Sequence, residues 1–169
     1  MSRTTARLRT GLIIAAFSVG ALTLSGCTSL SDLFPQEAAR DAETQEISEA
    51  GEADVFSLTV GDCFNDQDAD EVESVTAIPC ADAHDYEAYF AFDVTEDGAF
   101  PGDDALTQIA EDGCVAEFAT FVGKSYEEST LLFNYLSPSE GSWDSGDREI
   151  LCLVMGEDKT TGSLAGTGV

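Results

Sequence analysis

Basic residues are scarce in this chain. Lysine and arginine number 7 against 33 aspartates and glutamates among 169 residues, and the formal net charge is -26. Such a surface repels phosphate groups, which excludes nucleic-acid binding and leaves solubility as the simplest role of the charge. An acidic surface can still attract cations or a basic partner, although acidic loops are more often only solvated.

Motifs for catalysis and metal binding are also missing. Histidine occurs once, at His84, and the chain contains neither a GxSxG elbow nor a CxxC pair. The first motif marks an activated serine, and the second is typical of zinc sites and redox-active thiols. We therefore expect no catalytic residue, no resident metal and no cofactor, and the sequence favours a protein that is not an enzyme.

Long apolar runs are absent except for one near the start. Three arginines (Arg3, Arg7 and Arg9) precede the run GLIIAAFSVGALTL, which is too short for a spanning helix and has the form of a secretory signal peptide. The next residues, Leu24-Ser25-Gly26-Cys27, resemble the bacterial lipobox. That resemblance implies lipid transfer to the sulfur of Cys27, with palmitate among the expected acyl chains, and cleavage after Gly26.

Cys27 also explains an odd number of cysteines. The chain has five, whereas extracytoplasmic proteins normally close theirs in pairs. A lipidated Cys27 would leave four, and two or more acyl chains would hold the protein on the outer face of the cell membrane. The alternative is a plain secreted protein with an unmodified Cys27.

Removal of the signal peptide, residues 1–26, leaves 143 residues, enough for one domain and a tail. It removes three arginines and no acid, so four basic residues remain against 33 acidic ones. Residues 27–54 are rich in Glu, Ala, Ser and Gln, which predicts a lipidated cysteine followed by a flexible acidic tether. We expect the folded domain over residues 55–166 and a flexible tail over 167–169.

The domain contains both strand and helix patterns. Strands are predicted over residues 55–64, 72–78, 85–94, 131–138 and 148–156 from β-branched, aromatic and alternating residues. In the third of these, Tyr86, Ala88, Phe90 and Phe92 would share one face, leaving the other half exposed. Between the strands, apolar residues recur every three or four positions from Leu106 to Val122, which predicts a helix capped by Asp103 or Asp104 and ended by Gly123.

These elements predict an α+β fold: a small, mostly antiparallel sheet with one main helix packed on it. In an oxidising compartment Cys63, Cys80, Cys114 and Cys152 would form two disulfides. Four cysteines allow three connectivities, which sequence alone does not resolve. Proximity along the chain favours Cys63 with Cys80, and hence Cys114 with Cys152.

Several segments together resemble the septum formation domain of high-GC Gram-positive bacteria. They are GDCF at 61–64, IPCADAHDYE at 78–87, Cys114 with Phe118 and Val122-Gly123 after it, WDSGDREILC at 143–152, and the closing TGSLAG. The resemblance covers residues 60–166. It implies a role near septum formation in cell division. One departure is Ala83, where the family commonly has proline before the histidine.

Three side chains are candidate binding residues. His84 has acidic neighbours that would orient an imidazole or hold a metal, but the favoured role is a structural bond in the turn after the first disulfide. Trp143 is expected to cover the small core, with glycan stacking as the alternative. Arg148 is expected to pair with an acid such as Asp147 or Glu87, with anion binding as the alternative.

The loop NDQDADEVE at 65–73 has aspartates at alternate positions, as calcium loops do. Glu71 stands where an EF-hand needs glycine, and Ala77 stands where it needs the bidentate glutamate. A solvated loop is therefore the expectation.

The sequence thus predicts a lipid-anchored extracytoplasmic lipoprotein that binds or scaffolds a protein or cell-wall partner at the envelope, with septum formation as its context. One alternative is a ligand-binding lipoprotein that takes a cation, peptide or glycan. The other is an envelope hydrolase or transferase that uses His84.

Overall fold

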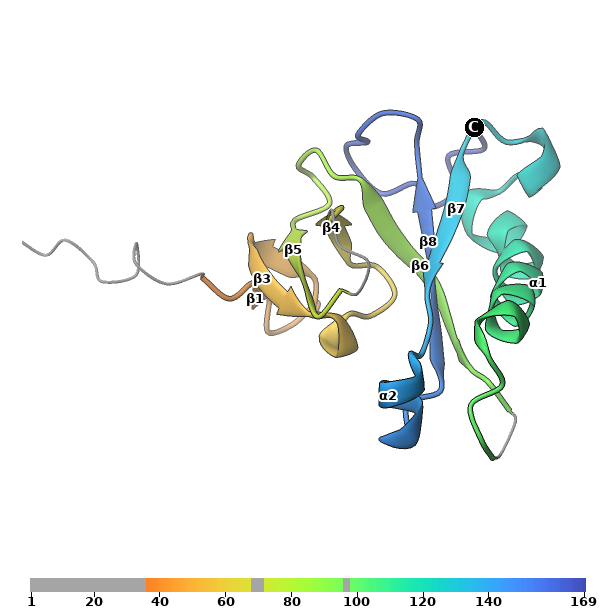
Figure 1. Cartoon of the computed structure of the whole chain (residues 1–169). Helices are drawn as coiled ribbons and strands as arrows, with labels where there is room; N and C mark the ends of the chain where they lie inside the picture. Colours follow the sequence, from red (N-terminus) through yellow and green to blue (C-terminus); the bar gives the residue numbers. More distant parts are fainter. Residues whose placement is uncertain (1–35, 68–71, 96–97) are drawn as a thin grey trace, which may run out of the picture.

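A computed structural model describes residues 36–67, 72–95 and 98–169. Figure 1 shows a curved sheet with one long helix packed against it. The sheet is antiparallel, has six strands in the order β3-β5-β4-β6-β8-β7, and a separate two-stranded sheet joins β1 to β2. The strands are β1 (Ala39–Arg40), β2 (Ile47–Glu49), β3 (Gly51–Asp54), β4 (Cys63–Asn65), β5 (Ser74–Ile78), β6 (Tyr86–Asp93), β7 (Leu132–Leu136) and β8 (Glu149–Met155). The helices are α1 (Asp103–Val122) and α2 (Glu140–Asp144), with 3-10 turns η2 (Val55–Ser57) and η3 (Tyr126–Glu128).

The predicted α+β class, the mostly antiparallel sheet and the single main helix are confirmed. The helix α1 buries a stripe at helical spacing, Leu106, Ala110, Cys114, Phe118 and Val122. Gly123, in the left-handed conformation, ends α1 as predicted. The predicted aspartate cap is wrong, because Gly102 is the N-cap and no side chain caps it; Asp103 and Asp104 instead lie in the first turn, where their charge favours the helix dipole.

The strand β8, between β6 and β7, has buried side chains on both faces, since successive side chains of a strand point to opposite sides. Ile150, Cys152 and Val154 pack in the core under α1. Leu151 and Leu153 pack in a second core on the other face. Side chains from β3, β4 and β5 also pack in this second core. The curved sheet therefore covers this face of β8 itself, in the place that α1 takes on the other face (Figure 1).

The prediction that one face of β6 is half exposed is wrong for its first part, where Glu87 and Tyr89 are buried, whereas Ala91 is half-buried and Asp93 is exposed as predicted. The pairing of β6 with β8 shifts between Ala88 and Phe90, which is a β-bulge at Tyr89. As a result Ala88 packs in the second core, whereas Tyr89 and Phe90 both pack with the α1 core. Glu87, on the face expected to be half exposed, is only 2% exposed.

The flexible tether predicted over residues 27–54 is wrong for its described part. Residues 36–54 form β1, β2 and β3, and β3 pairs along its length with β5. Arg40 donates two hydrogen bonds of 2.6 Å to the buried carboxylate of Asp62. The acidic composition suggested disorder, but the segment gains backbone pairing and a bidentate ion pair that composition does not reveal.

Both ends of the predicted domain therefore change. Its first predicted strand, 55–64, is instead the turn η2 followed by a loop, and only Cys63–Asn65 is a strand. The predicted flexible tail is bonded: the amide of Gly168 donates to the carbonyl of Val122, and the hydroxyl of Ser129 donates to the carbonyl of Val169. The described fold extends from residue 36 to residue 169.

Both favoured disulfides are present. Cys63 is bonded to Cys80, with a Cα–Cα distance of 5.1 Å, and Cys114 is bonded to Cys152, at 5.4 Å. The first links β4 to the end of β5, and the second fastens α1 to the middle of β8. Within the described residues, no helix has both the length and the apolar character needed to cross a membrane.

Candidate functional site

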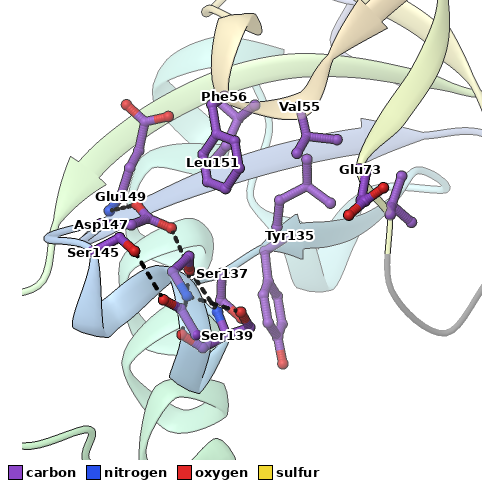
Figure 2. A pocket seen from close by; sticks show the side chains of 14 residues that line it. Val55, Phe56, Glu73, Tyr135, Ser137, Ser139, Ser145, Asp147, Glu149 and Leu151 are labelled. Carbon is purple, nitrogen blue, oxygen red and sulfur yellow. Dashed lines mark hydrogen bonds between the residues drawn. The ribbon is translucent and has the colours of Figure 1, made fainter.

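An open groove of about 760 Å³ lies between the two halves of the curved sheet. One wall comes from η2 and the segment leading into β5, and the other from α2 and the ends of β7 and β8 (Figure 2). Its lining residues are Val55, Phe56, Val72, Glu73, Tyr135, Leu136, Ser137, Ser139, Gly141, Ser142, Ser145, Asp147, Glu149 and Leu151. Its volume falls within the range of small-molecule sites.

The first wall carries an unusually exposed aromatic ring. Phe56 is 69% exposed, the most of any large apolar residue in the described structure. Its position is fixed by η2, because the carboxylate of Asp54 accepts a hydrogen bond of 2.9 Å from the backbone amide of Phe56. Leu151, 2% exposed, lines the groove as part of the second core. A partner that covered the Phe56 ring would bury apolar area that the chain itself leaves in water.

The opposite wall is polar and locally rigid. The short helix α2 begins with a capping box, in which the Ser139 hydroxyl accepts from the Ser142 amide and the Ser142 hydroxyl accepts from the Ser139 amide. Ser142 also donates a hydrogen bond of 2.8 Å to the carboxylate of Asp147. The serine hydroxyls and this carboxylate form a wall suited to polar contacts.

An acidic cluster lies at the end of the groove beside β8. Glu149 is directly opposite Asp93 in the pairing of β8 with β6, and Asp147 lies two residues before it. Burial raises the pKa of Glu149, and the neighbouring charges of Asp93 and Asp147 raise it further. The arrangement therefore disfavours negative charge on Glu149, and a bound cation would relieve the repulsion.

The structure places His84 away from this groove. Its side chain is completely buried, and its Nδ1 lies 2.9 Å from the carbonyl oxygen of Asp82. Its Nε2 lies 3.0 Å from the hydroxyl of Thr160, and the two residues also exchange both backbone hydrogen bonds. The turn contact with Asp82 matches the structural role that the sequence favoured, while the link to Thr160 joins two distant parts of the chain.

Trp143 and Arg148 lie together, but neither forms an open site. Trp143 is 2% exposed, and its indole N–H donates to the carbonyl of Gly98 at 2.9 Å. The guanidinium carbon of Arg148 lies 3.6 Å from the centre of a Trp143 ring. Arg148 also donates to the backbone carbonyls of Trp143 and Asp147. A glycan has no exposed indole face on which to stack.

The predicted partner of Arg148 is wrong. The ion pairs of the described chain are Arg40 with Asp62 and Lys159 with Asp85. Arg148 uses an aromatic face and carbonyl oxygens instead of a carboxylate, an arrangement that suits its planar guanidinium. The carboxylate of Asp147 is occupied by Ser142 and by the amide of Glu149.

Glu87 accepts two hydrogen bonds of 2.6 Å, from the hydroxyl of Ser163 and the amide of Leu164. With Cys63 and Cys80 it forms the closest grouping of metal-type ligands in the described structure. Both sulfurs are committed to a disulfide, however, and the carboxylate oxygens already have donors. The residues therefore fit a structural tie between β6 and the C-terminal segment and do not fit a metal site.

The Asp85 carboxylate accepts from the amide of Asp66 and pairs with Lys159 at 2.6 Å. Burial acts to raise the pKa of Asp85, but the hydrogen bonds from Lys159 and from the amide of Asp66 outweigh burial, and the pKa is lowered.

Two predicted features lie outside the described residues: the lipidation site Cys27, and Asp68 and Asp70 of the calcium-like loop.

The sequence interpretation missed the groove. Phe56 falls in a segment whose residues are typical of a strand, and the closeness of Glu149 to Asp93 depends on strand pairing. One signal was available: Ser139 and Ser142 follow Pro138, a pattern typical of a helix start.

Two comparisons with known proteins match this chain. A family model described as "Septum formation" matches residues 60–169. The protein named "Putative lipoprotein LppN" of Mycobacterium tuberculosis (strain ATCC 25618 / H37Rv) is 30% identical over 105 residues, which cover 59% of this chain and 57% of that protein. The protein of the same name from Mycobacterium bovis (strain ATCC BAA-935 / AF2122/97) matches with the same identity and coverage. The chain thus matches little more than half the length of these relatives, and no solved structure matches it.

Proposed function

Because this chain belongs to the septum formation family, we propose that it is a lipid-anchored protein of the outer face of the cell membrane whose domain binds a partner at the envelope during septum formation. The observation that carries the binding role is the open groove with Phe56 on its wall. A soluble domain gains nothing in stability by holding an aromatic ring 69% exposed beside an apolar surface, whereas a partner that covers the ring gains its full burial.

The anchor is supported by two independent observations. The residues Leu24-Ser25-Gly26-Cys27 match the lipobox, and the relatives from both mycobacteria are named lipoproteins. Eight residues separate Cys27 from Gln36, where the described fold begins. Chain geometry limits that segment to about 30 Å when fully extended. A lipid on Cys27 would therefore keep the groove close to the membrane, within reach of membrane proteins and newly made wall.

The alternatives have less support from the side chains. A hydrolase or transferase that uses His84 would need a ring nitrogen facing its substrate, but His84 is completely buried and both nitrogens have partners. A glycan-binding lipoprotein that uses Trp143 would need an exposed indole. The groove favours a partner protein because its apolar wall and its polar wall together resemble a protein-binding surface.

The anchor is tested by intact-mass analysis of the protein purified from its native membrane. A diacylglyceryl adduct on Cys27 is expected, and in a Cys27→Ala protein both the adduct and the cleavage after Gly26 should be lost. An unmodified Cys27 would contradict the anchor.

The binding role is tested in dividing cells with a photoreactive phenylalanine analogue placed at position 56. A matched control carries the analogue at Leu132, which is also exposed, at 45%, but lies outside the groove. We expect a discrete crosslinked product from position 56 that is absent from position 132, together with concentration of the labelled protein at division sites. Equal crosslinking from both positions and uniform peripheral staining would contradict the proposal.

A further inference from the structure

The acidic cluster consists of Asp147 and Glu149, which line the groove, and Asp93, which lies opposite Glu149 on β6. In the described structure no ion pair neutralises it. Arg40 and Lys159 are paired elsewhere, with Asp62 and Asp85. Arg148 lies between two members of the cluster in sequence, yet its guanidinium packs on Trp143. The reason is the alternation of side chains at the start of β8, which sends Arg148 to the opposite side from its neighbours.

Like charges directly opposite each other on antiparallel strands destabilise a sheet. Glu149 and Asp93 are such a pair, and Asp147 adds a third negative charge at the same end of the groove. A positive group placed there would remove the repulsion between the carboxylates and would be attracted by all three of them. The groove is therefore electrostatically complementary to a basic ligand.

The wall opposite carries the apolar residues Val55, Phe56 and Val72 beside Glu73, and the ring of Phe56 is its exposed part (Figure 2). A small inorganic cation would satisfy the carboxylates but leave this ring in water. An arginine or lysine side chain suits both walls, because its methylene stem packs on apolar surface while its charged end reaches the acids.

We propose that the groove binds a segment of a partner protein in which basic side chains stand beside apolar ones; this rests on the proposed binding function and specifies its partner. A second copy of this chain is disfavoured as the occupant, because each copy carries a formal charge of -26 and would bring further acids to the groove. The occupant is a different protein whose exposed segment is basic and apolar.

Calorimetric titration of the full chain in neutral detergent at low salt tests this proposal. The probe is a blocked five-residue peptide that alternates aliphatic residues with arginine. In one control peptide glutamate replaces arginine, and in the other serine replaces the aliphatic residues. We expect binding of the first peptide, no binding of the second, and weaker binding of the third. Because the attraction is largely between exposed charges, the affinity should fall as salt is added.

Two pairs of variants locate the site. Glu149→Gln should weaken peptide binding about threefold, while Glu111→Gln, which removes the same charge from the exposed face of α1, should leave it unchanged. Phe56→Ala should weaken binding about tenfold, as expected for an aromatic anchor, while Leu132→Ala should have no effect. All four residues are on the surface, so these variants are expected to remain folded, which circular dichroism would check.

Each result has a separate meaning for the two proposals. Equal losses for Glu149→Gln and Glu111→Gln, or equal binding of the glutamate peptide, would overturn the basic partner. Spermidine that binds as tightly as the peptide, or soluble wall fragments that bind the groove in its place, would also overturn it. Crosslinking from position 56 would survive these failures, because it requires only a partner at the groove. Loss of that crosslinking would instead remove the binding function itself.

Discussion

The ion pair between Arg40 and Asp62 allows a direct test of where the folded domain begins. Asp62 is 2% exposed, and its carboxylate accepts two bonds from Arg40 and two from Thr59. Arg40→Met keeps the apolar stem of the side chain but leaves the buried carboxylate without its cation. Breaking a buried ion pair in this way costs about 3 to 5 kcal/mol. Because 25% of the Arg40 side chain remains exposed, solvent screening reduces the expected loss to about 2 kcal/mol.

Urea unfolding followed by the fluorescence of Trp143, the chain's single tryptophan, measures this loss. In a thermal melt, the same loss of about 2 kcal/mol corresponds to a fall in melting temperature of about 8 °C for a domain of this size. Arg40→Lys is the matched control: it keeps the charge but not the two-bond geometry, so it should lose about half as much. Asp62→Asn should cost about 1 to 2 kcal/mol less in the Arg40→Met background than in the native chain, because the pair is already broken.

An Arg40→Met protein whose free energy of unfolding stays within about 0.5 kcal/mol of native would refute this reasoning. Residues 36–54 would then contribute little to the fold, and the acidic segment would act as the tether that its composition suggests. Retention of the native value in Asp62→Asn as well would show that the pair forms without stabilising the domain.

Three further predictions concern other parts of the fold. Gly51→Ala should lower the free energy of unfolding by about 2 kcal/mol, because a Cβ there would lie 2.5 Å from the backbone nitrogen of residue 38. Gly141→Ala, whose nearest atom is 3.8 Å away, lies in α2, where alanine is favoured over glycine, so it should leave the free energy of unfolding unchanged or raise it by up to about 1 kcal/mol. Equal urea midpoints for the two variants would contradict this packing. Replacing Cys114 and Cys152 by alanine should cost about 4 kcal/mol in the chain-entropy model for a separation of 38 residues, and an unchanged thermal midpoint would argue against it. Glu149→Gln should raise the free energy of unfolding at pH 7 by less than about 1 kcal/mol, because the pKa of Glu149 is raised in the folded protein and its charged form therefore destabilises the fold. The stability contributed by protonated Glu149 is fully present below the ordinary pKa of glutamate and is lost as pH rises through the raised pKa, so the gain from glutamine should vanish near pH 4. A gain that does not depend on pH would exclude this cause.

The Glu149 prediction also bears on binding. The same substitution that stabilises the isolated protein is expected to weaken its hold on a basic peptide. Such an opposition between stability and binding is common where a site holds charges that its ligand neutralises.

Local patterns were enough for the central part of the fold. The stripe from Leu106 to Val122 predicted α1, because a helix that covers a sheet must repeat its apolar residues at helical spacing. Cysteine proximity favoured Cys63 with Cys80, and the second disulfide followed by elimination. The position of His84 in the turn after Cys80 was enough to favour a structural bond within that turn, and the structure identifies the carbonyl of Asp82 as its partner.

Local patterns failed where pairing over long distances decided the outcome. The acidic segment 36–54 lacks an apolar stripe, yet β5 supplies hydrogen bonds to β3 and Asp62 supplies a partner for Arg40. The bulge at Tyr89 changes which β6 side chains face α1, and no feature of alternation alone marks it. Arg148 was expected to find an acid, but the tertiary structure offers it the ring of Trp143.

By itself, the sequence determined the class of the protein: an acidic chain with a motif that resembles the lipobox, an α+β pattern, four cysteines in the domain and the motifs of its family. Composition and short motifs carry this information because they depend on residues that are near one another in the chain. Only the tertiary structure decided where the groove proposed as the binding site lies. The groove joins Phe56 to Glu149 across nearly a hundred residues of sequence, and the charges at its end face one another because β6 and β8 pair in one register.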